Sequence, residues 1–138
     1  MKQSGYTNRS VNKKVKNATP LKFNGIQFRS KLEVYCYKVL NDFSIPAEYE
    51  ETKFQILEPF IYNEEKIRGM YFTPDFVGDD FVIECKGFMN DAFPLRWKLF
   101  KHYLLANNFR YDLYLPRNKK DVEAVVNDII SKRHGRVK

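Results

Sequence analysis

The spacing of apolar residues along the chain predicts three helices. The first begins at Ser30-Lys31-Leu32-Glu33, a capping-box sequence, and ends before Ile45-Pro46, because a residue that precedes proline disfavours helical backbone. The second spans residues 94–107, with Leu95 among its apolar positions, and the third opens at Asn118. The apolar face of this third helix consists of Val122, Val125, Val126, Ile129 and Ile130.

The segments around these helices have the character of β-strands. Residues 22–28 form a short extended piece, residues 48–57 and 66–72 are strand-like, and Pro59 ends or interrupts the first of the longer strands. Gly78-Asp79-Asp80 has the composition of a tight turn, which makes residues 73–77 and 81–86 the two arms of a hairpin. Residues 111–115 form a last strand before Pro116. This order predicts an α/β fold, bordering on α+β, with a mixed central β-sheet flanked by helices.

Composition and charge narrow the class of protein. The 138 residues carry a net charge of +7, and residues 1–20 are polar and basic without hydrophobic periodicity. We expect a flexible basic arm over residues 1–20, a single domain over residues 21–138, and a polyanionic partner. The sequence has no run of about 18 apolar residues and no apolar signal-peptide core, so we expect no membrane partner. Cys36 and Cys85 lack metal-type spacing and predict reduced core residues in a cytoplasmic protein.

The hairpin at residues 73–86 brings candidate catalytic side chains together. Side chains alternate between the two faces of a strand, so Glu84 and Lys86 project to one side, whereas Ile83 and Cys85 face the core. Asp75 lies on the neighbouring arm. Carboxylates can hold Mg²⁺, which activates water, and Lys86 either positions or deprotonates that water or stabilises the transition state as a cation. The pattern favours phosphodiester hydrolysis over its alternative, a surface hairpin with a Glu–Lys pair.

The same residues carry a resemblance to a known superfamily. Pro74-Asp75 followed by Glu84-Cys85-Lys86 resembles the signature of the PD-(D/E)XK nucleases, which implies a restriction-endonuclease-like core. Residues 26–90 are also similar, in the same order, to the phage endonuclease I family of Holliday junction resolvases. The similar segments are Phe28-Arg29-Ser30-Lys31-Leu32-Glu33, Glu48-Tyr49-Glu50-Glu51, Tyr71-Phe72-Thr73-Pro74-Asp75-Phe76 and Phe81-Val82-Ile83-Glu84-Cys85-Lys86-Gly87.

The resemblance implies a catalytic site and its cofactor. Asp75, Glu84 and the backbone carbonyl oxygen of Cys85 would bind Mg²⁺, for which Mn²⁺ can substitute, and Glu33 and Lys86 would complete the catalytic residues. Spacing alone also allows Glu33 a structural role, as the acceptor of the N–H of the helix-cap residue. The family further implies a homodimer that cleaves two strands of branched DNA and whose protomers can exchange elements. If the protein is phage-encoded, it would act in the host cytoplasm. No small-molecule cofactor is expected.

Basic residues in three places are expected to contact DNA phosphates. They are Lys13, Lys14 and Lys16 in the arm, Arg29 before the first helix, and Arg96, Lys98 and Lys101 on the second helix. For the second helix the alternative is an ordinary solvated face. Glu50 and Glu51 are interpreted as solvated strand residues, with the alternative that one of them lies near the metal.

Two features depart from the phage family. Residues 55–69 are longer than its corresponding connection, and the segment after Pro94 is not similar to it. Two other functions therefore stay open. One is an endonuclease that cuts linear duplex DNA, as in transposition or restriction, and the other is a DNA-binding module with an inactive nuclease site.

Overall fold

The computed structural model describes residues 21–137, so the predicted arm with Lys13, Lys14 and Lys16 lies outside the described residues. The described chain begins with a hairpin of β1 (Leu21–Phe23) and β2 (Ile26–Phe28). Asn24 and Gly25 connect the two strands with φ values of 54° and 77°, the left-handed backbone that suits a two-residue hairpin turn. The single extended piece predicted for residues 22–28 is therefore wrong, because the Asn-Gly turn folds it in two.

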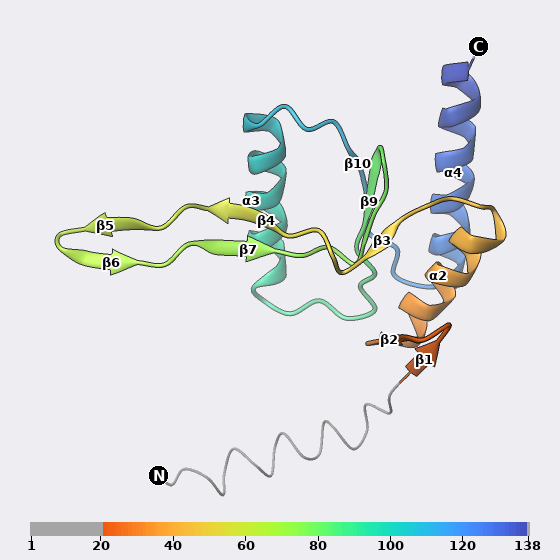
Figure 1. Cartoon of the computed structure of the whole chain (residues 1–138), viewed down its shortest axis with the longest axis horizontal. Coiled ribbons are helices and arrows are strands. Elements are labelled where there is room, and N and C mark those ends of the chain that lie inside the picture. Colours follow the sequence, from red (N-terminus) through yellow and green to blue (C-terminus); the bar gives the residue numbers. More distant parts are fainter. Residues whose placement is uncertain (1–20, 138) are drawn as a thin grey trace, which may run out of the picture.

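A mixed four-stranded sheet forms the centre of the molecule (Figure 1). Its strands are β3 (Glu48–Tyr49), β8 (Phe76–Val77), β9 (Phe81–Ile83) and β10 (Asp112–Tyr114), in the order β10-β9-β8-β3. β8 pairs antiparallel with both β3 and β9, whereas β9 and β10 run parallel. A parallel pair needs a long crossover, which α3 (Phe93–Ala106) supplies.

Helices cover both faces of this sheet. α2 (Lys31–Asp42) and α4 (Lys119–Val137) lie on one face, and α3 lies on the other (Figure 1). Phe81 and Ile83 pack into the core with α2 and α4, whereas Val82, which points the opposite way, packs into a second core with α3. The predicted mixed sheet flanked by helices is confirmed.

The helix boundaries follow their predicted signals. The Ser30 hydroxyl accepts the N–H of Glu33 at 3.1 Å, and the Asn118 side chain accepts the N–H of Asp121 at 2.8 Å, so both predicted caps are formed. Leu95 departs from the predicted apolar face of the second helix, because 58% of its surface is exposed. The buried face of α3 consists instead of Phe93, Trp97, Phe100 and Leu104.

An antiparallel β-ribbon extends from the sheet. β4 (Phe54–Leu57) pairs with β7 (Met70–Phe72), and β5 (Phe60–Tyr62) pairs with β6 (Glu65–Ile67) at the projecting tip (Figure 1). β5 was not predicted as a strand. The ribbon is interrupted between these two strand pairs, at Gly69. A Cβ on Gly69 would lie 2.6 Å from the carbonyl oxygen of Leu57, so the close approach of the two backbones there requires glycine.

A second interruption separates the ribbon from the sheet, between β3 and β4 on one strand and between β7 and β8 on the other. Glu50 has a φ of 53° there, and its N–H donates to the carbonyl of Asp75 at 2.9 Å. The interruption therefore places Glu50 and Asp75 side by side. None of the helices within residues 21–137 has the length and apolar character needed to cross a membrane.

Candidate active site

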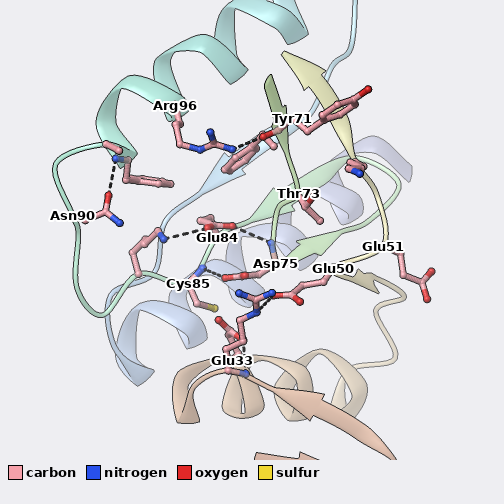
Figure 2. A pocket seen from close by; sticks show the side chains of 16 residues that line it. Glu33, Glu50, Glu51, Tyr71, Thr73, Asp75, Glu84, Cys85, Asn90 and Arg96 are labelled. Atoms are coloured by element: carbon pink, nitrogen blue, oxygen red, sulfur yellow. Dashed lines mark hydrogen bonds and ion pairs between the residues drawn. The ribbon is translucent and has the colours of Figure 1, made fainter. Parts of the chain in front are cut away.

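A cleft of about 670 Å³ opens at this interruption. Its lining comes from the first turn of α2, the ribbon, the residues after β9 and the start of α3 (Figure 2). Within the described part of the chain, the buried polar and charged residues are Glu33, Asp75 and Glu84, each 6% exposed, and all three line this cleft. Burying a carboxylate is costly unless it is paired or serves a function, so this concentration marks the cleft as the candidate site.

Asp75 and Glu84 hold each other in place through the backbone. The N–H of Asp75 donates to Oε1 of Glu84 at 3.0 Å, and the N–H of Cys85 donates to Oδ2 of Asp75 at 2.8 Å (Figure 2). This reciprocal arrangement uses one oxygen of each carboxylate. The two side chains are thereby oriented into the cleft from neighbouring strands, as the hairpin pattern predicts.

Lys86 lies on the same side as Glu84, as the alternation of side chains predicts. Its Nζ is 3.5 Å from Oε2 of Glu84 and 4.6 Å from the ring centroid of Phe93. The segment after β9 remains tied to the parallel strand, because the N–H groups of Glu84 and Lys86 donate to the carbonyls of Tyr114 and Pro116, each at 3.0 Å. An ammonium group is therefore fixed at the edge of the cleft.

Glu33 enters the cleft from the first turn of α2. Its Oε1 accepts the hydroxyl of Tyr49 at 2.6 Å and the backbone N–H of Arg29 at 3.2 Å. The predicted capping contact is therefore shifted by one residue, because the carboxylate reaches the N–H of Arg29 and not that of the cap residue Ser30. Glu33 thus serves the helix start and lines the cleft at the same time.

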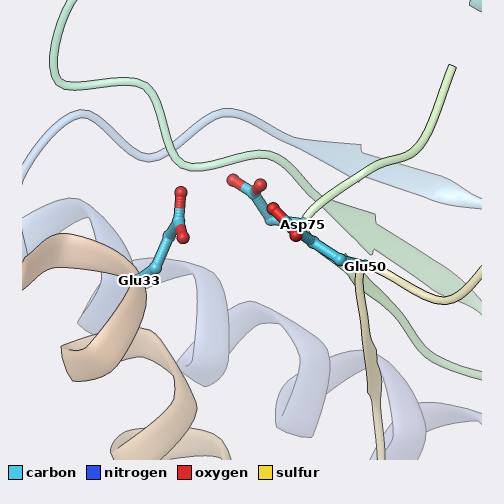
Figure 3. A group of neighbouring side chains, drawn as sticks. All are labelled: Glu33, Glu50 and Asp75. Atoms are coloured by element: carbon cyan, nitrogen blue, oxygen red, sulfur yellow. The ribbon is translucent and has the colours of Figure 1, made fainter. Parts of the chain in front are cut away.

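Glu50 joins this group, although the sequence favoured a solvated position for it and did not distinguish it from Glu51 as a residue near the metal. One carboxylate oxygen from each of Glu33, Glu50 and Asp75 lies within 4.8 Å of the others, and the three side chains converge in Figure 3. Oε2 of Glu50 also pairs with Nε of Arg29 at 2.9 Å. The interpretation of Glu50 as a solvated strand residue is wrong, because its left-handed backbone ends β3 and turns the side chain inward. Glu51, interpreted likewise, is exposed.

Burial and mutual repulsion disfavour the ionised carboxylates. Burial raises the pKa of Asp75 to about 8, and the nearby carboxylates of Glu84 and Glu33 contribute to this rise. Burial also raises the pKa values of Glu33 and Glu84, against the opposing effect of the hydrogen bonds that they accept. A bound cation would relieve this repulsion. The donor set consists of carboxylate oxygens, which hard divalent cations prefer, so the residues fit a metal ion of that kind.

The predicted DNA-contact residues have different surroundings. Arg29 lines the cleft and pairs with Glu50, and Arg96 lines it while its guanidinium donates to the carbonyl of Tyr71 and lies 5.8 Å from the ring centroid of Phe72. Arg96 thus also ties α3 to the ribbon. Lys98 and Lys101 are exposed on α3 and do not line the cleft.

The two cysteines lie beneath the site. Cys36 and Cys85 are free, buried thiols in the core shared with α2 and α4, as predicted. A hydrogen bond with the Cys36 thiol and burial raise the pKa of the Cys85 thiol, so it is a poor nucleophile. The role of the Cys85 carbonyl oxygen as a metal ligand stays a prediction.

Comparisons of the chain with protein-family models, with curated proteins and with solved structures give no match.

Proposed function

We propose that the protein is a metal-dependent endodeoxyribonuclease of the PD-(D/E)XK type with a restriction-endonuclease-like core. One observation carries the proposal: the three buried carboxylates of the described chain, Glu33, Asp75 and Glu84, line one cleft together with Lys86. Four side chains that the resemblance names as catalytic thus come to one place from α2, the ribbon junction and the segment after β9. An ordinary surface hairpin has no reason to bury two carboxylates.

Each residue has a role that its contacts support. Asp75 would hold Mg²⁺ together with Glu84 and the carbonyl of Cys85, and Glu33 and Glu50, whose carboxylates converge with that of Asp75, would extend the set of ligands toward α2. Mg²⁺, or Mn²⁺ in its place, would supply an activated water and would neutralise charge that develops on the phosphate. Lys86, paired with Glu84, faces the same space and stabilises the negative transition state or positions the water.

The proposed substrate is branched DNA such as a Holliday junction, and the proposed active form is a homodimer. It would act in the cytoplasm, which is that of the host cell if the protein is phage-encoded. The similarity of residues 26–90 to phage resolvases supports this specificity, and the net charge of +7 supports a polyanionic substrate.

The deciding experiment is a cleavage assay on a labelled four-way junction and on a linear duplex of the same sequences, with Mg²⁺ and with EDTA. Paired, Mg²⁺-dependent cuts confined to the junction are expected, and the Asp75→Asn variant should make none. Equal cutting of both DNAs would support the nuclease activity and contradict the proposed specificity for branched DNA. Tight binding without cleavage in any metal would make the protein a DNA-binding module instead.

A further inference from the structure

The ribbon forms a wall of the cleft with a chemical character of its own. Figure 2 shows Tyr71 on the side of the cleft opposite Glu33. Tyr71 and Gln55 are direct cross-strand partners and share one face of the ribbon, whereas Phe54 and Phe72 share the other face and are buried against α3. Tyr71 lines the cleft and is 47% exposed, so its ring lies on the solvent side of the ribbon and not in the core.

Two contacts hold this exposed side chain, and a third holds the backbone of the same residue. The side-chain amide of Gln55 donates to the Tyr71 hydroxyl at 3.1 Å, and Nζ of Lys53 lies 4.7 Å from the centroid of the ring. The guanidinium of Arg96 donates to the Tyr71 backbone carbonyl. A ring fixed in this way loses little conformational freedom on binding a planar ligand, which favours stacking.

We propose that Tyr71 and Lys53 form a binding site for an unpaired nucleotide of DNA, with the base on the tyrosine ring and its phosphate on the lysine ammonium. The inference rests on the proposed function, because it assigns this site to the DNA strand that enters the cleft. Aromatic rings bind any base through its π-face, and a neighbouring cation holds the backbone. An unpaired base can come from a single strand or from an opened branch point.

The other exposed apolar residues of the ribbon do not extend this site. Phe60, Ile61 and Tyr62 are exposed on β5, near the projecting tip where Glu64 and Glu65 also lie. These residues do not line the cleft. The site is confined to the base of the ribbon, and Tyr62 provides a matched control.

The test measures DNA affinity of the full chain in EDTA, so that metal-dependent cleavage does not enter. The DNAs are a single-stranded oligonucleotide, a four-way junction and a linear duplex. Tyr71→Ala should weaken binding to the single strand and the junction by about 10-fold or more and leave the duplex within about 2-fold, because a base-stacking partner is removed. Tyr71→Phe, which keeps the ring, and Tyr62→Ala should bind like the wild type. Lys53→Gln should weaken binding and lower the salt dependence for the single strand by about 0.7 in the logarithmic slope.

Loss on the single strand alone would support the site and identify unpaired strands, not branch points, as the source of the base. An unchanged affinity of Tyr71→Ala for both unpaired DNAs would overturn the proposal, as would an equal loss on the duplex or an equal loss in Tyr62→Ala. These affinities stand whether or not the wild type cleaves DNA in Mg²⁺, so failure of the nuclease proposal is detected separately.

Discussion

The hydroxyl of Tyr49, on the edge strand of the sheet, donates a 2.6 Å hydrogen bond to Oε1 of Glu33, on the first turn of α2. The Tyr49 ring packs between Phe28 and Phe76, with centroid distances of 4.6 and 5.3 Å. Both hydrogen bonds that Glu33 accepts end on Oε1, so within residues 21–137 its Oε2 accepts none. Tyr49 does not line the cleft itself, but it orients the carboxylate of Glu33, which does.

Replacing Tyr49 by phenylalanine removes this hydrogen bond and keeps the ring contacts. We expect the Mg²⁺ concentration for half-maximal cleavage to rise about 10-fold, because a candidate ligand is no longer oriented. The free energy of unfolding should fall by about 1 kcal/mol. Tyr35→Phe is the control, since it removes the Tyr35–Glu123 hydrogen bond away from the cleft. An equal rise in both variants would assign Tyr49 a purely structural role.

The raised pKa of Asp75 predicts an unusual dependence of stability on pH. Between the ordinary value of 3.8 and the folded value of about 8, the native state binds more protons than the unfolded state. Without metal, the free energy of unfolding should therefore fall as pH rises across this window, by up to about 1.4 kcal/mol per pH unit. Glu33 and Glu84 act in the same direction.

Urea unfolding in EDTA at pH 5, 6.5 and 8 checks this dependence. Asp75→Asn should flatten it and make the protein more stable than the wild type at pH 8. Mg²⁺ should stabilise the wild type at pH 8 and have little effect on the variant. Parallel pH profiles of the two proteins would show that Asp75 ionises normally.

Glu50 and Glu51 offer a matched pair for metal binding. Glu50→Gln should weaken Mn²⁺ binding by about 10-fold in a calorimetric titration, because one of the three converging carboxylates is removed. Glu51→Gln changes the same charge one residue away on an exposed side chain and should bind within about 2-fold of the wild type. Identical losses in both would indicate a general effect of charge and not a ligand.

Glu84→Gln separates folding from catalysis. A glutamine can still accept the N–H of Asp75, so the fold and the melting temperature should be retained. Cleavage should fall by about 100-fold or more, because the variant lacks both a carboxylate at the metal and the partner of Lys86. Wild-type turnover in this variant would place the active centre elsewhere.

The predicted basic arm can be tested by deletion. Removing residues 1–20 should weaken DNA affinity and lower the salt dependence of binding by about 0.9 in the logarithmic slope for each duplex phosphate that the arm neutralises. A replacement of the arm by a neutral linker of equal length controls for chain length. An unchanged slope would mean that the arm does not touch DNA.

The strands and caps around the candidate catalytic residues were predictable because local rules decide them. Period-two alternation after the Gly78 turn places Glu84 and Lys86 together, and the Ser30 cap fixes the helix that carries Glu33. These patterns depend on a few neighbouring residues, so tertiary contacts do not override them.

Glu50 and the ribbon tip were not predictable for the opposite reason. The inward turn of Glu50 depends on a left-handed backbone that its own side chain does not favour and on a bond to Asp75, 25 residues further along. At the tip, Asn63 and Glu64 have φ values of 48° and 69°, and a glutamate in that position is not a recognised turn signal.

The parallel pairing of β9 with β10 has a consequence for synthesis of the protein. The backbone N–H groups of Glu84 and Lys86 donate hydrogen bonds to the carbonyls of Tyr114 and Pro116. These two partners leave the ribosome about 30 residues later. A nascent chain therefore contains every candidate catalytic side chain before it contains the strand that anchors two of them. We therefore expect the cleft to assemble, and the proposed nuclease activity to appear, only after residues 112–116 have been synthesised.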